Sequence, residues 1–262
     1  MGCADGLLLQ PSCNPIECKA DRRTVEFEGG ELEIWTVRGR QPEGAAPDLF
    51  ILSFIGCGDR AEEWAALEAD TWSDSSAEIW VVNYPGYGRS TGPAALERIP
   101  PSALVAYDEL RKVASDRPIV VSGNSLGCTV ALHVAASRPV AGAVLRNPPP
   151  LRSLILGEYG WWNLWIGAAI VAVQVPSELD SSDNAQKVRT PALFISASDD
   201  DVVPPSYQQN VIDAYAGQKQ VVLFEGGHDS YVGPGENATL KEALRWLAAE
   251  SRSAVPRHET SK

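Results

Sequence analysis

The sequence predicts an α/β fold, in which a mostly parallel central sheet carries helices on both faces and a small inserted cap. From residue 49 onward, short apolar runs of strand length alternate with segments of helical periodicity, which is typical of a parallel sheet. The motif Gly-Asn-Ser-Leu-Gly at 123–127 joins one such run to a helix of small residues. With 262 residues, 44% of them hydrophobic, the chain can bury one large core, so we expect a single domain over 24–250.

Periodicity and turn residues predict the elements in chain order. Residues 1–23 show no periodicity and contain scattered prolines and cysteines, so we expect an irregular arm. The segments 24–27 and 32–37 are expected strands, joined at Gly29-Gly30 in the manner of a hairpin. The other expected strands are 49–55, 79–83, 119–121, 141–145, 192–197 and 221–224, and the expected helices are 61–69, 101–115, 128–136, 206–216 and 236–250.

Residues 147–187 interrupt this alternation of strands and helices. Three consecutive prolines open the segment, three tryptophans follow, and strand signals stop. We interpret the segment as a small cap inserted after a strand of the sheet. The tail 251–262 is polar, and we expect it to be disordered.

The acidic composition limits the kinds of partner that the protein is expected to bind. The formal net charge is −12 and the sequence pI is near 4.7, so nucleic acid is not an expected partner. No apolar run approaches 18 residues, so no transmembrane helix is expected. The N-terminus lacks the basic and apolar regions of a signal peptide, which predicts a cytoplasmic protein. A truncated lipoprotein or export signal before Cys3 is the alternative, and the oligomeric state stays open.

The five cysteines are an odd number, which argues against a disulfide scaffold. Cys57 and Cys128 fall in segments assigned to the core or the site. Cys13 and Cys18 are close enough in sequence to pair in an oxidising compartment, so that pairing stays an alternative.

The segment 123–127 has the order of a nucleophile elbow. Its G-x-S-x-G pattern follows the β-branched run 119–121 and precedes a helix, so the turn is expected to lift the hydroxyl of Ser125 above the edge of the sheet. The flanking glycines allow the strand and the helix to approach closely. The pattern alone is weak, and it gains weight only if the chain also supplies a base and an acid.

His228 is the expected base, since a serine hydroxyl needs an adjacent base that an acid orients. The chain has three histidines. His133 lies within the helix after the elbow, where it is interpreted as packing, and His258 lies in the polar tail. His228 follows a short apolar strand and precedes the last helix, so its loop is expected to reach back over the strand ends.

The expected acid lies in the loop after the strand 192–197. Asp199, Asp200 and Asp201 are adjacent there, and three neighbouring carboxylates are costly unless one of them is bound or oriented. We predict Asp200, with the two others as alternatives. Along the chain the order is Ser125, Asp200, His228. After a nucleophile elbow of this type, the acid is expected first and the histidine second.

Two backbone N–H groups are predicted to stabilise an oxyanion. One belongs to Leu126, directly after the nucleophile, and the other to Cys57 in the loop Ile55-Gly56-Cys57-Gly58. Cys57 as a nucleophile is the alternative, and it is disfavoured because no separate histidine is available to activate it.

These pieces together resemble the serine α/β-hydrolases, particularly a branch of single-domain esterases, lipases and thioesterases with a Tyr-x-Gly-Tyr-Gly-x-Ser loop. The motifs that carry the resemblance are the loop 83–90, the elbow 123–127, the segment 190–204 and Gly226-Gly227-His228. They extend over most of 48–230, and the resemblance implies the α/β-hydrolase fold with a Ser-His-Asp triad. It says far less about the substrate.

The chain departs from the family pattern at the oxyanion loop and in the cap. Ile55-Gly56 stands where the family usually has His-Gly, which puts the support of that loop in question. In the cap, Trp161, Trp162 and Trp165 are predicted to bind substrate, together with Tyr84, as an apolar wall for an acyl chain or as a patch that touches a lipid surface. Packing on the sheet is the alternative for the tryptophans.

The sequence therefore predicts a serine hydrolase that cleaves a small-molecule carboxylic ester or thioester, with an apolar acyl group, through an acyl-enzyme. No metal or organic cofactor is implied. Two alternatives remain. One is an acyltransferase on the same fold, and the other is an inert, hydrolase-like binding protein whose irregular oxyanion loop prevents turnover.

Overall fold

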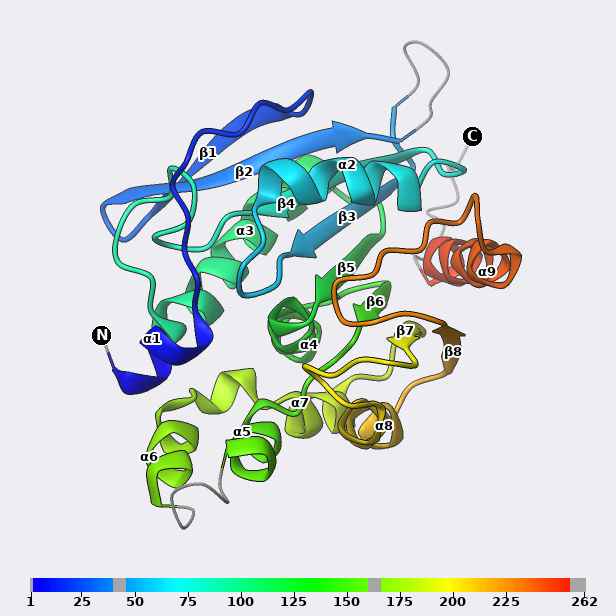
Figure 1. The fold of residues 1–262 in the computed structure, drawn as a ribbon. Helices are drawn as coiled ribbons and strands as arrows, with labels where there is room; N and C mark the ends of the chain where they lie inside the picture. The colour runs from blue at the N-terminus through cyan, green and yellow to red at the C-terminus, as the bar shows by residue number, and fades with distance from the viewer. Residues whose placement is uncertain (1, 40–45, 160–165, 255–262) are drawn as a thin grey trace, which may run out of the picture.

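The computed structural model describes residues 2–39, 46–159 and 166–254. An eight-stranded sheet runs through the molecule in the order β1-β2-β4-β3-β5-β6-β7-β8 (Figure 1). β2 pairs antiparallel with β1 and β4, and all other neighbours pair in parallel. The strands are β1 (Asp21–Phe27), β2 (Gly30–Arg38), β3 (Leu49–Phe54), β4 (Ala77–Val82), β5 (Ile119–Asn124), β6 (Gly142–Arg146), β7 (Ala192–Ala197) and β8 (Lys219–Phe224).

Helices cover both faces of the sheet. α3, α4, α7 and α8 pack side by side in one layer, while α2 and α9 lie on the other face (Figure 1). The main helices are α2 (Ala61–Thr71), α3 (Ile99–Ala114), α4 (Leu126–Ser137), α7 (Ser181–Lys187), α8 (Pro205–Ala214) and α9 (Ala238–Ser253). The predicted α/β-hydrolase fold, a mostly parallel sheet between two helical layers, is confirmed.

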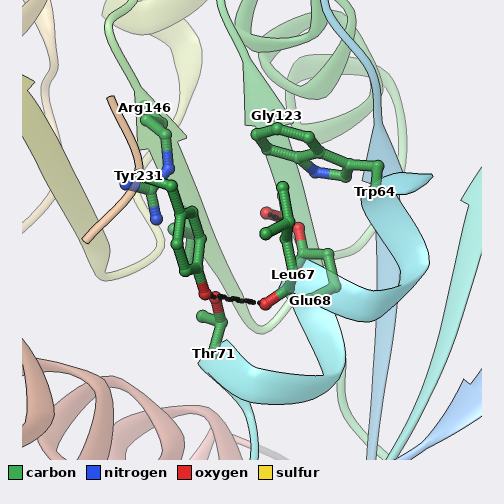
Figure 2. A pocket seen from close by; sticks show the side chains of 9 residues that line it. Trp64, Leu67, Glu68, Thr71, Gly123, Arg146 and Tyr231 are labelled. Carbon is green, nitrogen blue, oxygen red and sulfur yellow. Dashed lines mark hydrogen bonds between the residues drawn. The ribbon is translucent and has the colours of Figure 1, made fainter. Parts of the chain in front are cut away.

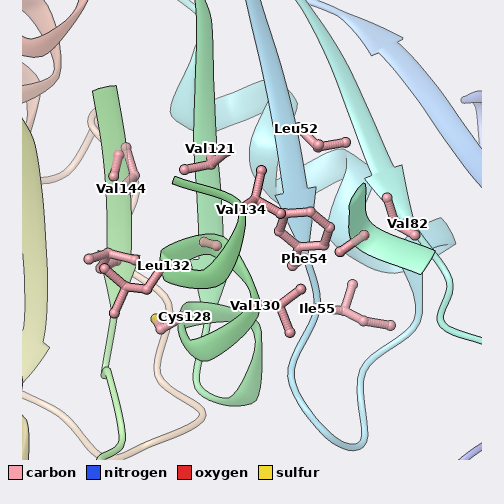
Figure 3. Packing of buried hydrophobic residues seen from close by; sticks show 14 of the residues in the cluster. Leu52, Phe54, Ile55, Val82, Val121, Cys128, Val130, Leu132, Val134 and Val144 are labelled. Carbon is pink, nitrogen blue, oxygen red and sulfur yellow. The ribbon is translucent and has the colours of Figure 1, made fainter. Parts of the chain in front are cut away.

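The central strands are apolar because they are covered on both sides. Every residue of β3, β4, β5, β6 and β7 is buried, as a parallel sheet between two helical layers requires. Figure 3 shows α4 packed onto this sheet, with Val130 of the helix facing Phe54 and Ile55 at the end of β3. The helix that follows the elbow is thus held within the core.

The strands and the helices α2, α3, α4, α8 and α9 match their predicted positions within a few residues. The β1–β2 turn is a two-residue connection in which Glu28 and Gly29 both have positive φ, at 49° and 74°. This is the backbone that a tight hairpin needs.

The N-terminal arm and the tail differ from the prediction. The arm contains a short helix, α1 (Cys3–Leu8), and Ala4 and Leu9 are buried against the rest of the protein. At the other end, α9 continues to Ser253, and Ser251 is fully buried, so disorder from residue 251 is wrong for 251–253. Both predictions were based on local composition. They failed because these segments pack against residues that are far away in the sequence.

The segment 147–187 is helical and divides into two parts. α5 (Leu151–Tyr159) and α6 (Ile166–Gln174) pack against each other, and α6 also contacts α1. A 3-10 turn, η3 (Ser177–Leu179), then leads to α7, which packs between α4 and α8 in the main layer. Trp161, Trp162 and Trp165 lie outside the described residues.

All five cysteines are free, so Cys13 and Cys18 are not paired. Within the described residues, no helix has the length and apolar character needed to cross a bilayer.

Candidate active site

Ser125 occupies a strained turn between β5 and α4. Its backbone has φ 50° and ψ −116°, a conformation that residues other than glycine rarely adopt. Its N–H donates to the carbonyl of Arg146 at 2.9 Å, which ties the turn to β6. A Cβ on Gly127 would lie 2.0 Å from the carbonyl oxygen of Phe54, so only glycine allows α4 to start so close to β3. The predicted elbow geometry is present.

His228 connects Ser125 with Asp200. Its Nε2 lies 3.0 Å from Oγ of Ser125, and its Nδ1 lies 2.8 Å from Oδ2 of Asp200. The Asp200 side chain is fully buried and that of His228 is 11% exposed. The three side chains predicted from three separate segments therefore form one hydrogen-bonded chain, in the arrangement that lets a base accept the serine proton.

Asp200, in the loop after β7, is oriented by four hydrogen bonds. Oδ1 accepts from the N–H groups of Val202 and Val203 at 3.0 and 2.7 Å, and Oδ2 accepts from Gln208 at 3.0 Å in addition to His228. The alternatives Asp199 and Asp201 do not contact His228: Asp199 accepts from Ser198 and the Gly226 N–H, while Asp201 is exposed.

Asn147 fastens the His228 loop to the sheet, a role that the sequence did not indicate. It follows β6 with a positive φ of 49° and is fully buried. Its Nδ2 donates to the carbonyl of His228 at 3.2 Å, and its Oδ1 accepts from the N–H of Ala197 at 2.9 Å. The side chain thus bridges the ends of β6 and β7 to the base.

The charges around His228 favour its protonated form. Burial alone would lower its pKa, but the hydrogen bond to Asp200 and the negative charges of Asp200, Asp229 and Asp59 outweigh burial and raise the pKa above its ordinary value. His133, by contrast, lies buried in α4, and burial lowers its pKa. The hydrogen bonds and the surrounding charges both distinguish His228 from His133.

The loop 55–59 is held by side chains that replace the support expected from a His-Gly pair. Asp59 Oδ2 accepts from the N–H of Gly56 at 2.8 Å and from Nδ2 of Asn124 at 3.0 Å. The carbonyl of Gly56 accepts from the Asp59 N–H at 3.4 Å. The aspartate therefore connects this loop directly to the residue before the nucleophile.

Two tyrosines hold the loop carbonyls. Tyr84 donates to the carbonyl of Ile55 and Tyr87 donates to that of Cys57, both at 2.7 Å. Tyr84 is completely buried, and burial raises its pKa well above the ordinary value. The prediction that Tyr84 contacts substrate is therefore wrong, because the hydroxyl is used inside the scaffold. The Tyr-x-Gly-Tyr-Gly motif supports the loop instead of lining the site.

The N–H groups of Cys57 and Leu126 have no hydrogen-bond acceptor among the described residues. Leu126 is the first residue of α4, where an N–H has no partner within the helix. The N–H of Gly56 and the carbonyls of Ile55 and Cys57 are occupied, whereas these two donors are available to a ligand. Burial, together with the charge of Asp59, raises the pKa of the Cys57 thiol, which disfavours the alternative of a thiolate nucleophile.

A cavity of about 250 Å³ opens beside His228, between α2, β6 and the loop 228–231. Its wall includes Asn124, Trp64, Arg146 and Tyr231. A smaller space of about 10 Å³ continues beneath it along α2, and Figure 2 shows Tyr231 extending there toward Thr71. The wall is thus partly aromatic and partly charged. The predicted apolar wall of Trp161, Trp162 and Trp165 lies outside the described residues.

Comparison with known proteins agrees with this architecture. Residues 53–170 match the model of the alpha/beta hydrolase family, and this range contains both the loop 55–59 and the elbow. The chain therefore has the α/β-hydrolase fold.

Similarity to individual proteins covers part of the sequence and most of the fold. The uncharacterized protein Rv2307c of Mycobacterium tuberculosis is 29% identical over 155 residues, 58% of this chain and 53% of that protein. The chain spans about half the length of the curated relatives it matches. The esterase Pf2001 of Pyrococcus furiosus superposes with a TM-score of 0.68 at 12% identity, covering 95% of this chain and 99% of that one. The thioesterase domain from the curacin biosynthetic pathway superposes with a TM-score of 0.59 at 14% sequence identity. The match covers 88% of this chain and 99% of that one.

Proposed function

We propose that this protein is a serine hydrolase that cleaves a carboxylic ester or thioester through an acyl-enzyme. The observation that carries the proposal is His228, which lies within hydrogen-bond distance of both Ser125 and Asp200. Ester or thioester hydrolysis fits this chemistry because each step needs one nucleophile, one base that can return its proton, and donors for an oxyanion.

In the proposed reaction, Oγ of Ser125 attacks the acyl carbonyl while Nε2 of His228 takes the hydroxyl proton. Asp200 holds Nδ1–H and stabilises the positive charge on the ring. The oxyanion accepts from the N–H groups of Cys57 and Leu126. His228 then returns the proton to the leaving alcohol or thiol, and a water activated in the same way cleaves the acyl-enzyme.

The helix α4 adds to the stabilisation of the oxyanion. Its N-terminus begins at Leu126, so the positive end of the helix dipole lies beside the proposed oxyanion position. Each lost donor in such a site typically costs about 3 kcal/mol of transition-state stabilisation. These features support turnover over the alternative of an inert binding protein.

Active-site labelling with a fluorophosphonate tests the proposal. We expect the wild type to be labelled and Ser125→Ala to lose labelling completely, while Cys57→Ala retains the label because its backbone N–H remains. Ser122→Ala, three residues earlier on β5, is a matched control that should still be labelled. Undiminished labelling of Ser125→Ala would refute the assignment. A 4-nitrophenyl ester series of increasing acyl length would then define the preferred chain length.

A further inference from the structure

The side chain of Arg146 is buried without an anionic partner beside the proposed active site. It extends from the end of β6, and the residue is only 6% exposed. Its Nη1 has no hydrogen-bond partner, and no carboxylate in the described part of the chain forms an ion pair with it. An arginine taken out of water without a counter-charge is unfavourable, so such a group marks a place where an anion is expected.

No acidic residue in the described part of the chain forms a direct ion pair with this guanidinium. Glu68 is closest in its electrostatic effect, but its Oε1 already accepts from Ser53 and Ser122, at 2.7 and 2.6 Å. Its Oε2 accepts from Trp72 at 3.1 Å. Both oxygens are therefore committed to neutral donors in the core.

The guanidinium is held in place by Tyr231. It lies 5.0 Å from the centre of the Tyr231 ring, a cation–π distance. The Tyr231 hydroxyl is itself fixed, since it donates to the carbonyl of Leu67 at 2.8 Å and lies 2.8 Å from the Thr71 hydroxyl. Figure 2 shows Arg146 beside Tyr231 in the pocket. The cation is pre-oriented rather than mobile, which reduces the entropy lost when a ligand binds.

The cavity that Arg146 lines is the one that reaches His228 and Asn124, the residue before the nucleophile. The backbone of Arg146 is tied to the elbow as well, because its carbonyl accepts from the N–H of Ser125. A substrate group in this cavity would therefore lie between the reacting centre and the guanidinium.

We propose that Arg146 binds a carboxylate carried by the substrate, so that the enzyme prefers esters or thioesters with one negative charge at the end of the group that fills this cavity. A planar carboxylate matches the fork of a guanidinium. Asp59, Glu63 and Asp229 also line the cavity, and the other arginine there, Arg60, is already paired with Glu62. The charges of the three acidic residues disfavour a more highly charged phosphate, which is why a single carboxylate is the better fit. The inference rests on the proposed function and adds a charged end to the substrate group, acyl or leaving, that fills the cavity.

Binding is tested without catalysis by thermal unfolding of Ser125→Ala with sodium butyrate, succinate or glutarate, against sodium chloride at equal ionic strength. We expect at least one carboxylate to raise the midpoint in a saturable way, and Arg146→Gln to abolish the rise. Arg138→Gln, which removes the same charge from an exposed pair with Asp108, is the control and should keep the rise. The proposal is overturned if carboxylates act no differently from chloride, or if Arg146→Gln responds as strongly as its parent.

Substrate preference is tested with two pairs of esters. In one pair the charge is on the acyl group, 4-nitrophenyl hydrogen glutarate against 4-nitrophenyl pentanoate. In the other it is on the leaving group, 4-carboxyphenyl butyrate against 4-methylphenyl butyrate. In one of the pairs we expect Arg146→Gln to lower the charged-to-uncharged ratio of kcat/KM by roughly 10- to 100-fold, the range for a charged hydrogen bond.

The outcomes separate this inference from the proposed function. If the uncharged esters are hydrolysed in a Ser125-dependent manner but neither ratio depends on Arg146, the carboxylate preference is wrong and the hydrolase assignment stands. If no ester is hydrolysed and the fluorophosphonate does not label Ser125, the hydrolase assignment fails. A purely structural arginine would instead lower the unfolding midpoint of Arg146→Gln while leaving both ratios unchanged.

Discussion

Removing the Asp59 carboxylate should weaken the oxyanion loop while all three side chains of the proposed triad remain. Asp59 Oδ2 accepts from the Gly56 N–H and from Asn124, so Asp59→Ala leaves two donors unpaired on either side of the reacting centre. The carbonyls of Ile55 and Cys57 are still held by tyrosines. We therefore expect the Cys57 N–H to lose its alignment in part.

The size of the effect follows from what one donor contributes. Complete loss of an oxyanion donor costs about 2.7–4 kcal/mol, or 10²- to 10³-fold in kcat. Because two loop carbonyls remain held, we expect about half of that energy, which corresponds to roughly 10- to 30-fold in kcat. KM should change little, since the donor acts mainly on the transition state.

The assay is steady-state hydrolysis of 4-nitrophenyl butyrate by wild type, Asp59→Ala and Asp59→Asn at the pH plateau of each protein. The amide oxygen of Asp59→Asn can accept both hydrogen bonds but carries no charge, so its kcat should stay close to that of the wild type. Circular dichroism melts verify that each variant is folded. A kcat of Asp59→Ala within threefold of the wild type would refute the role of the aspartate. Equal impairment of the two variants would show that its charge, and not its hydrogen bonds, matters.

Two further predictions concern the elbow and the base. Gly127→Ala should prevent folding, because its Cβ would lie 2.0 Å from a carbonyl oxygen of β3, while Gly235→Ala, which has no atom within 4 Å of its Cβ, should express and melt like the wild type. His228 must be neutral to act as a base, and its raised pKa places the acid limb of kcat/KM above the ordinary value of about 6.5. Asp229→Asn removes one of the charges that raise this pKa, so a pH–rate profile should show the limb at lower pH, whereas the exposed Asp201→Asn should leave it unchanged. An unshifted limb in Asp229→Asn would contradict the electrostatic account.

The sheet could be predicted from the sequence because each central strand is apolar on both faces and short. The same regularity made the order of the three candidate triad residues informative: Ser125, Asp200 and His228 each follow a predicted strand, and parallel strands end at the same edge of a sheet. The choice of Asp200 among three adjacent carboxylates could not be settled from sequence, because the three residues differ only in where their side chains point.

The supports of the site could not be predicted in the same way. Asn147 donates a hydrogen bond to the carbonyl of His228, which is distant in sequence, and Gln208 donates one to Asp200 across a turn. Neither residue belongs to a periodic pattern or to a motif with a fixed spacing, so the sequence gives no sign of these contacts. Tyr84 belongs to a motif that was noticed, but a motif gives no information on which way its hydroxyl points. Arg146 is the last residue of an apolar strand. A single charged residue at that position is typical of the start of a solvent-exposed loop, so the sequence did not indicate a buried side chain.

Arg146 shows why specificity and nucleophile geometry can vary separately in this fold. Its carbonyl holds the N–H of Ser125 and accepts from the thiol of Cys128 at 3.0 Å, and both contacts use backbone atoms that any residue supplies. Its side chain makes no hydrogen bond within the described structure and instead lines the cavity. A change at position 146 therefore alters the charge of the cavity while the elbow keeps its anchor. Gly127 is the opposite case, because its missing side chain is itself the condition for the elbow.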